Sequence, residues 1–241
     1  MVEIKINGKT VQANEGETIL EVATREGIYI PSLCHHEAVA ATGACRMCVV
    51  EAGKAGRKKK IVTACTFPVS AGVEVETSND RVKMNQKLVL ELLMSRAPQA
   101  KILDEIACRL DLEVPRRFEM ANADECILCG LCVRVCDEVV GANAITFNSR
   151  GADTKVGGPL MESPEDCIGC AACVYVCPTD CIKMTETAEA RTIVKWDRVL
   201  PMKKCAECGW PFMPNFQALQ FRKMTEVPKE FFSLCPDCRK H

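Results

Sequence analysis

Residues 126–136 read CILCGLCVRVC and residues 167–178 read CIGCAACVYVCP. Both stretches have the spacing C-x2-C-x2-C-x3-C, and a proline follows the last cysteine of the second stretch. Three cysteines two residues apart can curl around one corner of a metal cluster, whereas the fourth lies too far along the chain to join them. We therefore expect the fourth cysteine of each repeat to serve the site formed by the other repeat.

This spacing is typical of bacterial ferredoxins that hold two [4Fe–4S] clusters, whose function is to carry electrons. The ligands expected for one cluster are Cys126, Cys129, Cys132 and Cys177, and those for the other are Cys136, Cys167, Cys170 and Cys173. Two zinc sites or disulfides are the alternative, but the same arrangement would then have to arise twice by accident. Cys181, four residues beyond Cys177, is interpreted as a packed thiol near the cluster.

The composition of the 241 residues excludes several classes of protein. The 31 Lys and Arg balance 32 Asp and Glu, and aromatic residues are sparse, which disfavours nucleic acid as a partner. The 18 cysteines fall largely in C-x2-C groups, which favours metal over disulfides. We expect no signal peptide and no membrane span, because the chain has no apolar run of about 18 residues. A reducing cytoplasm suits such thiolates.

Residues 1–80 have the pattern of a β-grasp [2Fe–2S] ferredoxin domain. Val2–Ile6 alternates apolar and polar residues, Asn7-Gly8 predicts a hairpin turn, and residues 10–13 form the return strand. A helix is expected over residues 17–26, which end before Gly27. Further strands are expected at residues 48–51, 60–65 and 73–77. The basic stretch between the first two of these, GKAGRKKK at 53–60, is interpreted as a solvated hairpin tip; a docking patch for an acidic partner is the alternative.

The same segment contains four cysteines that suit a [2Fe–2S] cluster. They are Cys34, Cys45, Cys48 and Cys65, in the spacing C-x10-C-x2-C-x16-C. The plant-type spacing is C-x4-C-x2-C, so the first gap is wider here. A zinc site on these cysteines is one alternative, and ligation by His35 or His36 is another. A Rieske-type centre needs two histidines on one iron, and adjacent histidines point in different directions.

Two amphipathic helices, over residues 81–96 and 101–112, are expected in a connector that covers residues 81–121. Ala97-Pro98 separates them. Cys108 lies within the helical pattern of the second segment and is interpreted as a small buried residue.

The tail, residues 186–241, carries two further C-x2-C pairs. These are Cys205 with Cys208 and Cys235 with Cys238, separated by 26 residues. Paired C-x2-C knuckles predict a zinc-ribbon-like site, with one mononuclear iron or a third [4Fe–4S] cluster as alternatives. Phe212, Phe216, Leu219 and Phe221 are expected to cover the metal. The chain is thus expected to be an α+β protein, with the dicluster domain at residues 122–185 between the connector and the tail.

The cysteine pattern and its surroundings resemble a known family. Cys34-His35-His36, GACRMC at 43–48, and the segments 124–126, 137–141, 144–147 and 150–151 are similar to the large iron–sulfur subunit of respiratory complex I. They also resemble the related subunits of NAD-reducing and electron-bifurcating hydrogenases. The resemblance covers residues 1–95 and 122–185. That family has a further [4Fe–4S] cluster, ligated by one His and three Cys. Residues 81–121 contain only Cys108 and no His, so we expect that cluster to be absent.

The resemblance implies an iron–sulfur electron-transfer subunit of a cytoplasmic NAD(P)H-linked oxidoreductase complex, with no catalytic residues of its own. Its expected partners are an FMN- and NAD(P)-binding subunit and a thioredoxin-like [2Fe–2S] subunit. At the far end of the relay, the expected partner is a hydrogenase, a formate dehydrogenase or ferredoxin. The resemblance also implies a role in anaerobic metabolism, with electron bifurcation as one option. An autonomous multi-cluster ferredoxin-like carrier is the alternative. A zinc-ribbon protein that binds nucleic acid is disfavoured by the neutral charge.

Overall fold

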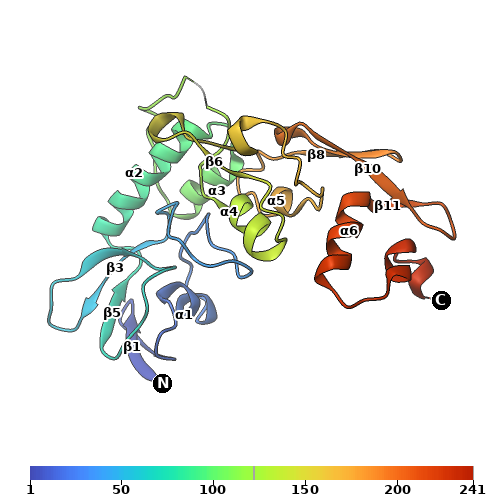
Figure 1. The fold of residues 1–241 in the computed structure, drawn as a ribbon. Helices are drawn as coiled ribbons and strands as arrows, with labels where there is room; N and C mark the ends of the chain where they lie inside the picture. Colours follow the sequence, from blue (N-terminus) through green and yellow to red (C-terminus); the bar gives the residue numbers. More distant parts are fainter. Residues whose placement is uncertain (122, 241) are drawn as a thin grey trace. The chain divides into compact units, whose positions relative to one another are not determined.

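A computed structural model describes residues 1–121 and 123–240 of the chain. It divides the chain into two compact units, Met1–Cys129 and Gly130–His241 (Figure 1). Each unit has its own sheet and its own groups of cysteines, and the expected α+β class is confirmed. Among the described residues, no helix is both long and apolar enough to cross a membrane.

The first unit is built on a five-stranded sheet in the order β2-β1-β5-β3-β4. The strands are β1 (Val2–Ile6), β2 (Lys9–Ala13), β3 (Val49–Lys54), β4 (Lys60–Thr63) and β5 (Val73–Glu76). Strands β1 and β5 are parallel, and the other neighbours are antiparallel. This order, with a single helix between the two hairpins, is the β-grasp arrangement that the sequence predicts. The basic segment 55–59 joins β3 to β4, so its interpretation as a hairpin tip is confirmed.

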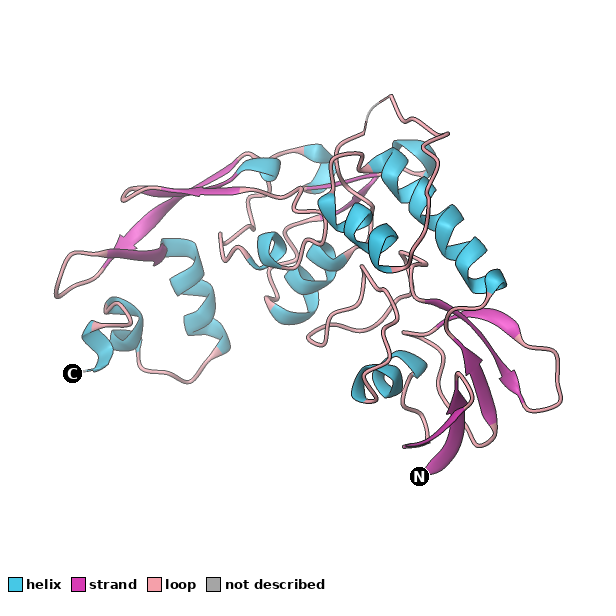
Figure 2. Ribbon diagram, turned by 180° about the vertical axis from the view of Figure 1, so that it is seen from behind, coloured by secondary structure: helices cyan, strands magenta, loops and turns pink. Residues whose placement is uncertain are grey.

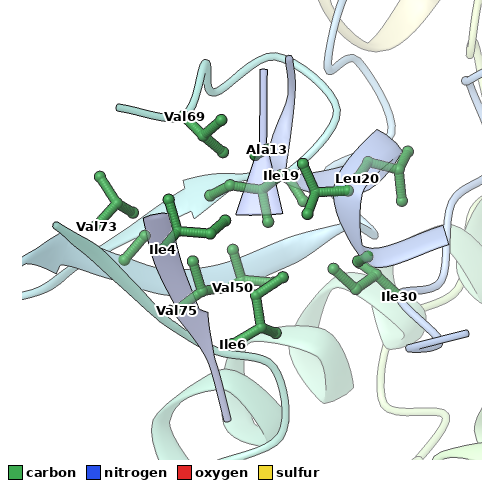
Figure 3. Packing of buried hydrophobic residues seen from close by; sticks show 14 of the residues in the cluster. Ile4, Ile6, Ala13, Ile19, Leu20, Ile30, Val50, Val69, Val73 and Val75 are labelled. Atoms are coloured by element: carbon green, nitrogen blue, oxygen red, sulfur yellow. The ribbon is translucent and has the colours of Figure 1, made fainter. Parts of the chain in front are cut away.

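The helix α1 (Ile19–Arg25) covers one face of this sheet (Figure 3). Thr18 and Glu21 form a capping box: the Thr18 hydroxyl accepts from the Glu21 N–H, and the Glu21 carboxylate accepts from the Thr18 N–H. Ile19 and Leu20 point from the helix into a core shared with alternate residues of the strands, such as Ile4 and Ile6. The core fixes where the loop between α1 and β3 begins and ends.

Helices α2 (Asp80–Arg96) and α3 (Lys101–Arg109) follow the sheet, as the sequence predicts. The Asn79 side chain caps α2, and Glu91, which is buried on α2, accepts two hydrogen bonds from the Arg117 guanidinium. Cys108 is exposed on α3, so its interpretation as a buried residue is wrong. Leu103 and Ile106 fill the apolar face instead, and Cys108 lies outside it.

The second unit begins with a short α-helix, α4 (Leu131–Arg134), that continues as a π-helical turn, η1 (Val135–Val139). A two-stranded sheet follows, formed by β6 (Thr146–Asn148) and β7 (Lys155–Gly157), with the 3-10 turns η2 (Gly151–Asp153) and η3 (Pro159–Met161). The short helix α5 (Ala172–Tyr175) carries part of the second cysteine repeat.

The rest of the second unit contains a four-stranded antiparallel sheet in the order β11-β10-β9-β8. Figure 2 draws the strands of the chain in magenta. The strands are β8 (Met184–Glu186), β9 (Ala190–Ile193), β10 (Arg198–Lys204) and β11 (Pro211–Pro214). The remaining elements are η4 (Val194–Trp196), α6 (Asn215–Met224), η5 (Lys229–Ser233) and η6 (Cys238–Lys240). The domain limits predicted from sequence remain a prediction, and residue 122, where one of them falls, lies outside the described residues.

Candidate metal centres

The first group of cysteines lies in the loop between α1 and β3 and directly after β4. All four of its members are buried: Cys34, Cys45, Cys48 and Cys65. The Cys48 Sγ lies 3.4 Å from the Cys65 Sγ, since Cys48 directly precedes β3 and Cys65 follows the paired end of β4. The Cys45 N–H donates to the Cys34 Sγ at 3.4 Å. The loop and the strand ends therefore supply two pairs of thiols, which is what the two irons of a [2Fe–2S] cluster need.

Hydrogen bonds among these four thiols lower the pKa of two of them and raise the pKa of the other two. The Cys45 thiol lowers the pKa of Cys34, and the Cys65 thiol lowers the pKa of Cys48. Hydrogen bonding to Cys34 raises the pKa of both Cys45 and Cys65. A bound metal cluster would be held by the four sulfurs as thiolates, so its positive charge would have to displace the thiol protons. His36 is exposed, and its Nδ1 accepts from the backbone N–H of Ala38.

A second group of cysteines lines one small pocket in the second unit, which we call the Cys136 pocket. Its four cysteines are Cys136, Cys167, Cys170 and Cys173, the set that the sequence assigns to one [4Fe–4S] cluster. Cys136 comes from the π-helical turn η1, and Cys173 from α5. Apart from these thiols the lining is almost entirely apolar, and it is completed by Val140, Ala142, Ala144, Ile145, Ile168, Ala171, Ala172, Ile193 and Trp196.

The Cys136 pocket is suited to a negatively charged cluster held by thiolates. Backbone N–H groups point at the sulfurs: Ala144 donates to the Cys136 Sγ at 3.4 Å, and those of Gly169 and Ala172 favour the thiolates of Cys167 and Cys170. Burial raises the pKa of all four thiols, that of Cys173 to about 12. Without metal these thiols stay neutral, so iron would have to displace their protons.

Gly169 allows the loop of the second repeat to lie against the four-stranded sheet. Its φ is +72°, and an added Cβ would lie 2.9 Å from the Leu200 Cδ1 and 3.0 Å from the Pro214 Cγ. We expect Gly169→Ala to cost about 1–3 kcal/mol through this overpacking and to lower iron content, because Cys167 and Cys170 flank the strained residue. Thermal unfolding and iron analysis of the purified protein measure both effects.

Gly151→Ala is the matched control for that substitution. Gly151 also has a positive φ, +61°, but an added Cβ there meets nothing within 4 Å. It therefore reproduces the backbone strain without the contact. Equal losses of stability and iron in the two variants would contradict the close approach of the sheet to Gly169.

The remaining set predicted for a [4Fe–4S] cluster is divided between the units. Cys126 and Cys129 are buried in the first unit, whereas Cys132 and Cys177 belong to the second. This ligand set stays a prediction. The Sγ of Cys177 lies 3.6 Å from the Sγ of half-buried Cys181, in agreement with the interpretation of Cys181 as a packed thiol beside a ligand.

The tail cysteines form a compact site. The Sγ atoms of Cys205, Cys208, Cys235 and Cys238 all lie within 4.8 Å of one another. Sulfurs at the corners of a tetrahedron around one zinc are about 3.8 Å apart, because each Zn–S bond is about 2.3 Å. The Cys208 and Cys235 sulfurs are 3.7 Å apart. In a cubane each thiolate binds a different iron, which sets the sulfurs further apart, so this geometry suits a single ion.

Backbone N–H groups prepare the tail site for a cation. The N–H of Cys208, together with that of Cys235 at 3.3 Å from the Cys205 Sγ, lowers the pKa of Cys205 to about 6. One thiolate is thus largely present at neutral pH before any metal binds. The Cys205 N–H donates to the Trp210 carbonyl at 2.8 Å, which closes the turn between β10 and β11. The residues fit a four-cysteine metal site.

The aromatic cover predicted for the tail is only partly correct. Phe216 and Leu219 are exposed on α6, and Phe212 and Phe221 are half-buried. The most buried phenylalanine of the tail is Phe232 in η5. The turn that carries Phe232 has no periodic pattern that would mark its buried side.

Sequence reasoning also missed three residues that approach the Cys136 pocket. Trp196, Arg191 and Arg198 come from the four-stranded sheet and the turn η4, beyond the second repeat. The Arg191 guanidinium donates to the Gly169 carbonyl at 2.7 Å, and Arg198 donates to the Glu165 carbonyl at 2.7 Å. The only available signal was the rarity of tryptophan, of which the chain has two.

Comparison with protein families agrees with this geometry. Residues 1–80 match the family described as a 2Fe-2S iron–sulfur cluster binding domain, and residues 120–184 match a 4Fe-4S dicluster domain. The chain therefore contains one segment similar to each of these two kinds of iron–sulfur domain. The tail site lies outside both matches.

This chain has relatives that are named as oxidoreductase subunits. It is 33% identical over 206 residues to NADPH-Fe(3+) oxidoreductase subunit alpha of Geobacter sulfurreducens, in an alignment that covers 74% of this chain and 24% of that protein. It is 28% identical over 235 residues to one of the NADH-quinone oxidoreductase subunits of Rhizobium meliloti, covering 87% of this chain and 27% of that protein. The chain thus spans about a quarter of the length of these curated relatives.

A solved structure shares the fold. A chain in the crystal structure of the NAD+-reducing [NiFe]-hydrogenase in its H2-reduced state aligns with a TM-score of 0.56 and 26% identity. The alignment covers 65% of this chain and 74% of that one. The resemblance to complex I and hydrogenase subunits, inferred from the cysteine motifs, is confirmed.

Proposed function

We propose that this chain is the iron–sulfur relay subunit of an NAD(P)H-linked oxidoreductase complex in the cytoplasm. It would pass single electrons between a flavin- and NAD(P)-binding subunit and a second redox partner. A hydrogenase, a formate dehydrogenase or ferredoxin is the partner class at the far end. A thioredoxin-like [2Fe–2S] subunit would complete the complex, and electron bifurcation is one use of such an arrangement.

The observation that carries this proposal is the gathering of separate groups of thiols in one chain. In the first unit, Cys48 and Cys65 are adjacent in a buried site, and in the second unit four cysteines share the largely apolar Cys136 pocket. Clusters bound there would each accept and release one electron. The protein's own part is to hold the thiolates, exclude water and direct backbone N–H groups at the sulfurs.

The nature of the partners rests on what the relatives are named for. Their names mention NADPH, Fe(3+), NADH, quinone and NAD+, and each is a subunit or a chain of a larger enzyme. A nicotinamide nucleotide delivers two electrons as a hydride, so a flavin has to stand between it and one-electron carriers. This reasoning supports a flavoprotein as the direct neighbour of the chain.

Anaerobic isolation of the native complex from its source tests the proposal. We expect a flavoprotein to copurify, and NAD(P)H to reduce the clusters, as followed by electron paramagnetic resonance. Isolation of a monomer that exchanges electrons with many reductases would favour the alternative, an autonomous carrier. Failure of NAD(P)H to reduce the clusters of a complex that contains flavin would overturn the proposed link to the nicotinamide nucleotide.

For the cofactors, we propose one [2Fe–2S] cluster, two [4Fe–4S] clusters and one zinc in the tail. Metal analysis of the anaerobic protein should then give about ten irons, the sum of two, four and four, and one zinc per chain. The closeness of the tail sulfurs supports the single ion. About fourteen irons without zinc would mean a third [4Fe–4S] cluster in the tail, and about eleven irons without zinc would mean a mononuclear iron there.

A further inference from the structure

The turn between β9 and β10 places a tryptophan against the Cys136 pocket. Trp196 is buried, with 4% of its surface exposed, and lines the pocket together with Ile193. Its indole Nε1–H donates to the Cys173 Sγ at 3.5 Å. Indole nitrogen is a donor only, and a buried indole needs an acceptor. Here that acceptor is a sulfur predicted to bind iron.

A hydrogen-bond donor that points at a ligand sulfur changes the reduction potential of the cluster that this sulfur binds. Reduction adds one negative charge, part of which falls on the thiolate sulfurs, so the N–H group stabilises the reduced state more than the oxidised state. Hydrogen bonds to sulfur and solvent exposure are among the factors that set the reduction potentials of iron–sulfur clusters. The buried indole removes water from one side of Cys173 and supplies one fixed dipole in its place.

We propose that Trp196 is a potential-setting residue, which raises the reduction potential of the [4Fe–4S] cluster bound in the Cys136 pocket through its hydrogen bond to Cys173. This inference rests on the proposed function, because it presumes that the pocket holds a cluster. Trp196 is a positioning residue in this sense: it touches a ligand sulfur and not the substrate of any partner.

Two arginines of the same sheet act in the same direction. Arg191 donates to the Gly169 carbonyl and Arg198 to the Glu165 carbonyl, so their charges lie beside the loop that carries Cys167 and Cys170. Glu186 pairs with Arg191 at 2.6 Å and offsets part of that charge. Trp196 is therefore the clearer test, because a neutral donor leaves the net charge unchanged when it is removed.

Trp196 lies outside the part of the chain that matches the dicluster domain family. The match to the dicluster domain family ends at residue 184, so Trp196 and both arginines belong to the segment that follows it. The four-stranded sheet of the tail thus completes a pocket whose cysteines come from the ferredoxin repeats. Its influence on the potential would be absent from a dicluster domain that ended with the second repeat.

Redox titration of the full chain, reconstituted anaerobically and followed by electron paramagnetic resonance, tests the proposal. Trp196→Phe keeps an aromatic ring but removes the donor. We expect the equilibrium constant for reducing this cluster to fall about fivefold, which is about 40 mV for a one-electron couple. Cys170→Ala, which removes a ligand of the pocket, identifies the signal that belongs to this cluster.

Trp210→Phe is the matched control, because its indole is 67% exposed. It should leave the potential unchanged. If Trp196→Phe fails to fold, site-specific replacement of Trp196 by 3-benzothienylalanine keeps the two-ring shape and lacks the N–H, and it should give the same fall. An unchanged potential in an intact cluster would overturn the inference alone. Wild-type protein without any [4Fe–4S] signal would instead overturn the proposed function.

Discussion

Replacing Cys170 with alanine should remove one complete [4Fe–4S] cluster and leave the others in place. Cys170 is one of four thiols in the Cys136 pocket, and the rest of the lining is almost wholly apolar, so no nearby oxygen or nitrogen side chain can replace it as a ligand. Iron content should fall from about ten to about six per chain. Iron analysis and spin quantification of the dithionite-reduced protein measure this loss, while the [2Fe–2S] signal should persist.

Cys108→Ala is the control for that variant. Cys108 is exposed on α3 and belongs to none of the predicted ligand sets. The same change of thiol to methyl there should leave iron content and signals unaltered. If Cys170→Ala kept about ten irons, or if Cys108→Ala lost several, the assignment of ligands to the pocket would be wrong.

Replacing Cys235 with alanine should have the second large effect: loss of the tail metal without loss of iron. Cys235 is buried, and its N–H and its sulfur both contact other tail cysteines, at 3.3 Å to the Cys205 Sγ and 3.7 Å to the Cys208 Sγ. Four-cysteine zinc sites contribute folding free energy directly, because the unfolded chain has no preformed site. We therefore expect zinc to fall from one to none and residues 205–240 to become sensitive to protease.

Elemental analysis and limited proteolysis followed by mass spectrometry check this result. Cys108→Ala serves again as the matched control and should retain zinc and resist cleavage in the tail. A variant at Cys235 that kept one zinc per chain would exclude the tail site. Parallel loss of iron and zinc would show instead that the tail metal supports the fold of the whole second unit.

Many of the local features could be predicted from the sequence. The strands of the first unit and α1 follow from short-range patterns, such as the alternation in Val2–Ile6 and the Asn7-Gly8 turn. Such patterns depend on neighbours within a few residues, which the sequence shows directly. The grouping of Cys205 with Cys235 was also predicted, because paired C-x2-C knuckles have few geometries that satisfy four thiolates.

Burial of single side chains was harder to predict. Cys108, interpreted from the sequence as a buried residue, is exposed on α3, and Phe216, expected to cover the tail metal, is exposed on α6. Phe232 is buried from a turn without any periodicity. Which face of a short helix is covered depends on contacts distant in sequence, and the helix pattern alone does not contain them.

The cysteine repeats by themselves determined the class of this protein, because C-x2-C-x2-C-x3-C is a constraint on how a short loop can present thiolates to a cluster. The tertiary structure decided what surrounds those thiolates. It brings Trp196 from the tail sheet to within 3.5 Å of the Cys173 Sγ and lays Leu200 and Pro214 against Gly169. These contacts join residues 23 to 45 positions apart, and they depend on the pairing of β8 to β11 and on the packing of that sheet, which no local pattern in the sequence specifies.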